Sequence, residues 1–74
     1  MNQQKILVLR SNIATSDDVT QLRVKLDMHP DINNWNVDLH DCDRVLRIET
    51  VSLTVHDIQS IISEHGYKCE ELDN

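Results

Sequence analysis

Apolar residues recur along the chain in two different periods, and each change of period marks a new element. Residues 5–10 form a short apolar run rich in branched side chains, which is typical of a central strand covered on both faces. Further along, Val19, Leu22 and Leu26 have the spacing of one stripe on a helix. The stripe ends before a proline, so the pattern predicts a helix over residues 16–28.

The start of this helix carries a capping signature. Thr15 is followed three residues later by Asp18, the spacing at which each side chain binds the backbone amide of the other residue. Asp17 adds a second carboxylate to the first turn, where the helix dipole favours negative charge. The junction between strand and helix is therefore interpreted first as helix-start chemistry.

The next segment predicts a hairpin. Trp35, Val37 and Leu39 alternate with polar residues in the period of a half-buried strand, and this apolar side, Trp35 included, is expected in the core. Residues 40–43 are polar and turn-rich, and residues 44–49 again have strand character. Two strands joined by this four-residue connection are expected.

A second helix is predicted after the hairpin. Thr54 and Asp57 repeat the capping spacing, and Leu53 with Ile58 is placed as a hydrophobic staple. Gly66 is the only glycine in the chain, and it follows the last helical residues, where a left-handed cap is expected. The helix is therefore expected to end at this glycine.

A last short strand fits within residues 67–72, which completes the order strand, helix, strand, strand, helix, strand. This order predicts an α+β, ferredoxin-like βαββαβ sandwich, with a four-stranded antiparallel sheet of order 4-1-3-2 and two helices on one face. The 74 residues are expected to form one domain over 1–74. In this topology the end of the first strand, the hairpin and the turn at Gly66 and Tyr67 lie at one end of the molecule.

Composition excludes several classes of function. The 13 acidic and 7 basic residues give a net charge of −6 with no basic cluster, so nucleic acid and anionic membranes are poor partners and a protein with a basic surface is the expected one. The aromatic content of 3% argues against RNA binding on the sheet. No nucleophile with a positioned base and no phosphate-binding loop is recognised, so no enzymatic activity is expected.

Two cysteines are too few for a disulfide scaffold, and the apolar run near the N-terminus is too short for a signal peptide or a spanning helix. A cytoplasmic location with reduced thiols is therefore expected. Cys69 lies at an alternate position of the last predicted strand and is interpreted as a buried, inert thiol. The edges of the predicted sheet allow a monomer or a weak homodimer.

The apolar skeleton resembles the heavy-metal-associated (HMA) domain, the small fold of copper chaperones and of the soluble modules of metal-pumping ATPases. Members of this family read as an apolar strand, then M-x-C-x-x-C-V, V-x-x-x-L, P-G-V, V-x-V-D-L and a late G-Y. The matching residues cover nearly the whole chain and are Ile13 in the methionine place, Val19, Leu22, Leu26, Pro30-Asp31-Ile32, Val37-Asp38-Leu39 and Gly66-Tyr67.

The departure from the family lies at the residues that carry its chemistry. Thr15 and Asp18 occupy the two cysteine places, so the thiolate pair that grips a soft Cu(I) ion is absent and no metal is expected at either residue. The resemblance, with this departure, implies a non-enzymatic protein-interaction or regulatory module without a cofactor. Its candidate interaction surface consists of Asp17, Asp18, Asp41, Asp43 and Tyr67, and an open face of the sheet is the other surface that could meet a partner.

A metal-ion carrier or sensor with non-standard ligands is the alternative. His40 and Cys42 are two residues apart and share a face on a regular strand, at the end of the topology that also holds Asp18 and His65. A mixed site of these four residues suits Zn(II), with a Cu ion as the other choice. The turn polarity of this stretch is the competing explanation.

Overall fold

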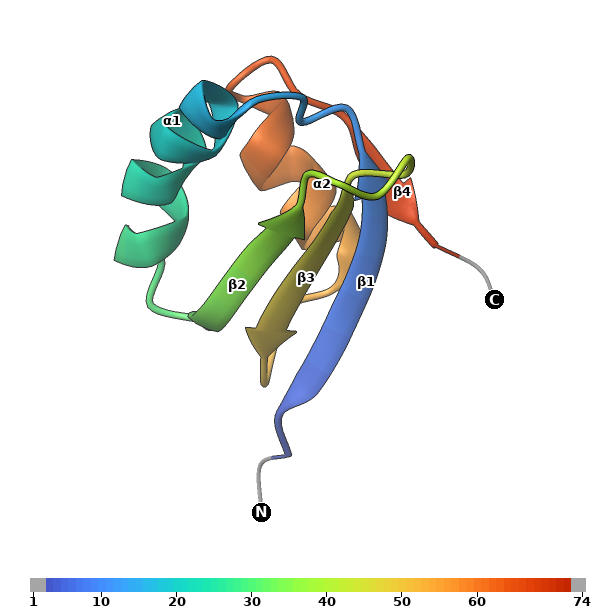
Figure 1. Ribbon diagram of the computed structural model, residues 1–74. Coiled ribbons are helices and arrows are strands. Elements are labelled where there is room, and N and C mark those ends of the chain that lie inside the picture. Colours follow the sequence, from blue (N-terminus) through green and yellow to red (C-terminus); the bar gives the residue numbers. More distant parts are fainter. Residues whose placement is uncertain (1–2, 73–74) are drawn as a thin grey trace.

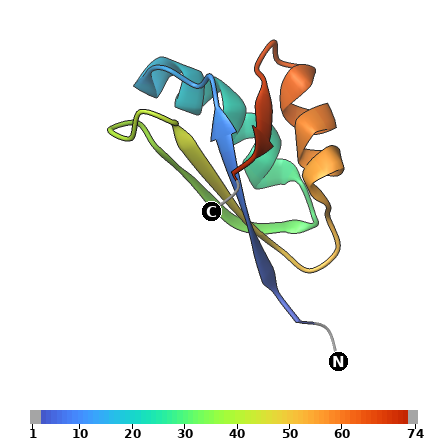
Figure 2. The same cartoon turned by 90° about the vertical axis from the view of Figure 1, so that its right-hand side faces the viewer.

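The computed structural model describes residues 3–72. Its elements are β1 (Lys5–Ser11), α1 (Ser16–Met28), β2 (Ile32–Asp38), β3 (Val45–Thr50), α2 (Val55–Ser63) and β4 (Cys69–Glu71). The strands form one antiparallel sheet in the order β2-β3-β1-β4, and both helices lie on the same face of it (Figure 1 and Figure 2). This confirms the predicted ferredoxin-like α+β fold and its strand order.

β1 is a central strand, as predicted, but only one of its faces is covered. Leu9 pairs with Leu46 of β3, and both side chains are fully buried beneath the helices. Ile6 is 59% exposed, so the expectation of cover on both faces was wrong. The reason is that both helices pack on one side, which leaves the other face of the sheet open.

The core between the sheet and the helices consists of aliphatic side chains. Trp35 packs against this core but is only half-buried, because its indole N–H reaches outward and donates to Asp27 Oδ1 at 2.7 Å. This bond ties α1 to β2. The buried cluster is made of Leu9, Ile13, Leu22, Leu26, Ile32, Leu46, Ile48, Leu53, Ile58, Ile61 and Ile62.

One polar side chain is fully buried within the described residues, and its hydrogen bonds are satisfied. The hydroxyl of Thr50 donates to the carbonyl of Asp31 at 2.6 Å and accepts from the amide of Leu53 at 3.2 Å. A buried hydroxyl without partners destabilises a fold, whereas this one joins the start of β2 to the connection before α2.

Both helices begin with the predicted capping boxes. The Thr15 hydroxyl accepts from the Asp18 amide at 3.2 Å, and the Asp18 carboxylate accepts from the Thr15 amide at 3.0 Å. In the same way, the Thr54 hydroxyl accepts from the Asp57 amide at 3.2 Å, and the Asp57 carboxylate accepts from the Thr54 amide at 2.9 Å.

Within residues 3–72, neither helix is both long and apolar enough to cross a bilayer.

α2 ends earlier than the sequence predicts. Its last residue is Ser63, and a turn then carries the chain to Gly66, whose φ of 84° is left-handed as expected. The amide of Tyr67 reaches back to the carbonyl of Ile62 at 3.2 Å. A Cβ at Gly66 would have open space around it, so the backbone conformation is what favours glycine here.

Truncation of a core side chain tests this packing. We expect Leu22→Ala to lower the free energy of unfolding by about 2–5 kcal/mol, because Leu22 is fully buried and the cavity does not collapse completely. The total for a chain of this size is about 4–11 kcal/mol. Val24→Ala, on the exposed side of the same helix, is the control and should change it by less than about 0.5 kcal/mol in urea unfolding. Equal losses in the two variants would contradict the assigned core.

Candidate functional site

Three connections meet at one end of the molecule, and we call this region the loop end. They are residues 12–15 after β1, residues 39–44 between β2 and β3, and residues 64–68 before β4 (Figure 1). The Ser11 amide donates to the Asp43 carbonyl at 3.0 Å, and the Asn12 amide donates to the Lys68 carbonyl at 3.1 Å. These bonds hold the three connections in one layer, as the topology predicted.

The Arg44 side chain joins the β2–β3 connection to the connection after β1. One guanidinium nitrogen donates both to the Ala14 carbonyl at 3.0 Å and to the Leu39 carbonyl at 2.9 Å. The backbone of Arg44 is left-handed, with a φ of 48°, and its carbonyl accepts from the Ser11 hydroxyl at 2.7 Å. The expected four-residue turn with Arg44 in the next strand was therefore wrong. The connection is longer because Leu39 and Arg44 both belong to it.

Asp18 joins the start of α1 to the entry of β4. Its Oδ2 atom accepts from the amides of Ala14 and Thr15 at 3.1 and 3.0 Å. Its Oδ1 atom accepts from the Tyr67 hydroxyl at 2.5 Å. The capping half of this arrangement was predicted, whereas the Tyr67 bond spans 49 positions of sequence and had no local signal.

These contacts shift the pKa values of both partners. The Tyr67 hydroxyl, and then the Ala14 amide, hold the pKa of Asp18 below its ordinary value. The same hydrogen bond, followed by desolvation, raises the pKa of Tyr67 above its ordinary value. Asp18 is therefore ionised and Tyr67 neutral at neutral pH, which are the forms that keep the bond.

The start of α1 offers oxygen donors that are already occupied. The Thr15 hydroxyl accepts the Asp18 amide, and both Asp18 carboxylate oxygens accept hydrogen bonds. A soft ion such as Cu(I) selects sulfur ligands, and neither residue supplies one. The chemistry of these two side chains therefore does not fit a copper ion at this position.

The members of the candidate interaction surface differ in their availability. Asp17 is exposed, whereas Asp18 and Tyr67 are half-buried and bonded to each other. Asp41 and Asp43 are also half-buried, and the Asp41 carboxylate accepts from the Asp43 amide at 2.8 Å, which shapes the turn. The structure places all five residues in two of the three connections, 39–44 and 64–68, and in the first turn of α1.

The structure does not gather the four residues of the alternative metal site. Among the described residues, the one group of three or more His, Cys, Asp or Glu side chains with metal-ligand spacing is Asp41, Cys42 and Asp43, whose donor atoms lie within 4.8 Å of one another. His40 is exposed beside this trio but is not part of it. His65 borders a depression along α1 instead.

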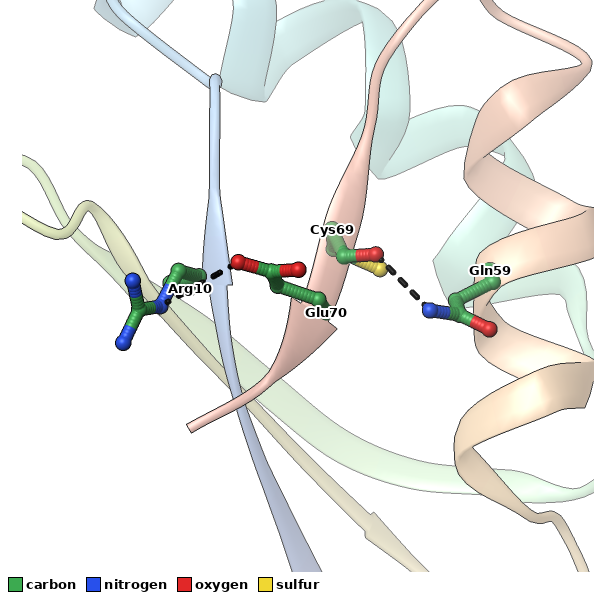
Figure 3. Close-up of polar contacts among 4 residues, drawn as sticks. All are labelled: Arg10, Gln59, Cys69 and Glu70. Carbon is green, nitrogen blue, oxygen red and sulfur yellow. Dashed lines mark hydrogen bonds and ion pairs between the residues drawn. The ribbon is translucent and has the colours of Figure 1, made fainter. Parts of the chain in front are cut away.

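A second depression, of about 550 Å³, lies along β4 near the loop end, and two contacts join pairs of its lining residues. Figure 3 shows Gln59 of α2 donating to the Cys69 carbonyl, at 3.0 Å, on one side of β4. On the other side, Arg10 of β1 pairs with Glu70 at 3.6 Å. Burial raises the pKa of the Cys69 thiol to about 11, so the thiol that lines this depression stays protonated at neutral pH.

The bond between Asp18 and Tyr67 predicts a pH-dependent stability. A carboxyl whose folded pKa is lowered stabilises the fold above its unfolded pKa of about 3.9, and this contribution is lost as the pH falls through the folded pKa. We expect Asp18→Asn to lower the melting temperature by a few degrees at pH 7, with a difference from wild type that shrinks toward pH 2. Tyr67→Phe should also lower the melting temperature at pH 7, because it removes the hydroxyl that donates to Asp18. Asp17→Asn is the control, and a shift as large in this variant would contradict the assignment.

Comparisons with known proteins support the fold. The chain is similar to the solved structure of a CsoZ metallochaperone, with a TM-score of 0.76 and 17% sequence identity over 92% of this chain and 99% of that chain. No family model matches the sequence, and no curated protein matches it. At this identity the likeness establishes the ferredoxin-like fold.

Proposed function

We propose that the chain is an HMA-like domain without the family's metal chemistry, and that it acts as a non-enzymatic protein-interaction module. Its loop end would contact a basic surface on another protein. The observation that carries the proposal is that the side chains of Thr15 and Asp18 are engaged in hydrogen bonds within the domain. Both lie where the family has metal-binding cysteines, and both are engaged in hydrogen bonds that stabilise the loop end.

The charge of the loop end and of the first turn of α1 beside it supports a basic partner. Asp17 is exposed, and Asp41 and Asp43 lie on the neighbouring connection. The loop end holds two cations: the Arg44 guanidinium binds backbone carbonyls, and Lys68 is exposed on the connection before β4. Within residues 3–72 the one ion pair is the Arg10–Glu70 contact at 3.6 Å, so these aspartates meet no cationic partner within the domain. Unpaired carboxylates on an ordered surface steer an oppositely charged protein toward it.

Charge reversal tests this proposal. The wild-type domain, immobilised, should retain basic proteins from an extract of its own organism at low salt and release them as the salt concentration rises. Asp17→Lys and Asp43→Lys should lose these proteins. Asp31→Lys, at the opposite end of α1, changes the net charge equally and should keep them. Identical retention by all three variants would reject the loop end as the contact surface.

Metal carriage through the β2–β3 connection is the second candidate. The spacing of Asp41, Cys42 and Asp43 favours it, because a thiolate and two carboxylates within 4.8 Å are a partial ligand set for Zn(II). Its weakness is the composition of this ligand set, in which Cys42 is the single sulfur donor.

An anaerobic titration of the reduced protein with Zn(II), and separately with Cu(I), distinguishes the two functions. The proposed interaction module predicts no stoichiometric binding tighter than micromolar by calorimetry, and the same result for Cys42→Ser. Tight binding that withstands a competing chelator and disappears in Cys42→Ser would replace the proposed function with metal carriage at the β2–β3 connection.

A further inference from the structure

A depression of about 520 Å³ runs along the outer side of α1, and none of the five residues of the proposed contact surface lines it. α1 lines it with one stripe at helical spacing, and the residues just after α1 and α2 complete it. The residues used in the argument are Val24, Lys25, Met28, His29 and His65. A volume of this size is typical of clefts that hold a ligand or a few side chains.

The depression exposes the two most accessible large apolar side chains among the described residues. Val24 is 65% exposed and Met28 is 78% exposed, and they lie one turn apart on the same side of α1. The buried stripe of the same helix is made by Leu22 and Leu26. α1 is therefore apolar on two sides, of which one forms the core and the other faces solvent. Adjacent exposed apolar side chains of this kind mark interaction surfaces.

The one charged side chain that lines the depression is a cation, whereas the chain as a whole is acidic. No acidic residue lines it, although the chain carries a net charge of −6. Lys25 is this cation, while His29 and His65, which the net charge counts as neutral, also border the depression. The nearest acid of α1 in sequence, Asp27, accepts the indole N–H of Trp35 and so faces β2 instead.

This charge pattern selects one kind of occupant. A second copy related by two-fold symmetry would present its own Lys25 and no carboxylate to this surface, so Lys25 would gain no oppositely charged partner in an isologous interface. An acidic segment with an apolar side satisfies both features, because its carboxylates meet Lys25 while its apolar side chains cover Val24 and Met28. Met28 suits this contact because a thioether side chain adapts to different neighbours.

We propose that this depression docks an acidic amphipathic helix of another protein, which lies along α1 and anchors on Val24 and Met28. Helices that bind a groove in this way present apolar anchors at three- and four-residue spacing. The domain then has two contact surfaces of opposite charge: the acidic loop end, and this basic and apolar side of α1.

A peptide titration tests the proposal. The probe is a synthetic peptide of about 18 residues with leucine along one helical side and glutamate elsewhere. In ¹⁵N-resolved NMR spectra of the full chain, it should shift the amides of residues 21–29 and of His65. A sister peptide with lysine in place of every glutamate should bind at least tenfold more weakly.

Matched variants identify the anchors. Val24→Ser and Met28→Ser should each weaken binding of the acidic peptide about tenfold, the loss expected for a buried apolar anchor. Ile6→Ser, which removes another exposed apolar side chain from the open face of the sheet, should leave the affinity unchanged. Asp17→Lys should leave it at least as strong, which separates this test from that of the loop end.

Three results would overturn the proposal. The first is the absence of shifts along α1 at millimolar acidic peptide, and the second is equal binding of the lysine peptide. The third is self-association of the chain in sedimentation, with concentration-dependent NMR shifts of the same amides, both lost in Met28→Ser. That result would assign the surface to a second copy of the chain.

Discussion

The loop end depends on the hydrogen bonds that the Asp18 carboxylate accepts. One of its oxygens accepts two amides that precede α1, and the other accepts the Tyr67 hydroxyl from the connection before β4. A single side chain thereby sets the start of a helix and the entry of an edge strand. The carboxylate provides this because it has several acceptor sites and stays ionised, and its hydrogen bonds favour that charge.

The elements that rest on local signals were predictable from the sequence. Thr15 and Asp18 lie three positions apart, and the same is true of Thr54 and Asp57, so a capping box is visible in a few consecutive residues. The order of strands follows from the order of elements, since few topologies accommodate it. The ends of elements were less predictable, as the early end of α2 at Ser63 shows.

Contacts between distant parts of the chain were not predictable in this way. Arg44 has no sequence feature that aims its guanidinium at the carbonyls of Ala14 and Leu39, because that geometry exists only after the connections meet. The bond from Trp35 to Asp27 likewise needs β2 beside α1. The sequence could therefore predict the bonds between Asp18 and Thr15, but not the bond that joins Asp18 to Tyr67.

The hydrogen bond from Gln59 to the Cys69 carbonyl bears on how the sheet ends. β4 is an edge strand, and a carbonyl that points outward from an edge is a template for pairing with another chain. Here the amide of Gln59 holds the position that the N–H of an added strand would take (Figure 3). A fifth strand gains no new hydrogen bond at this carbonyl until it displaces Gln59. α2 therefore protects this edge against growth of the sheet, in addition to covering the core.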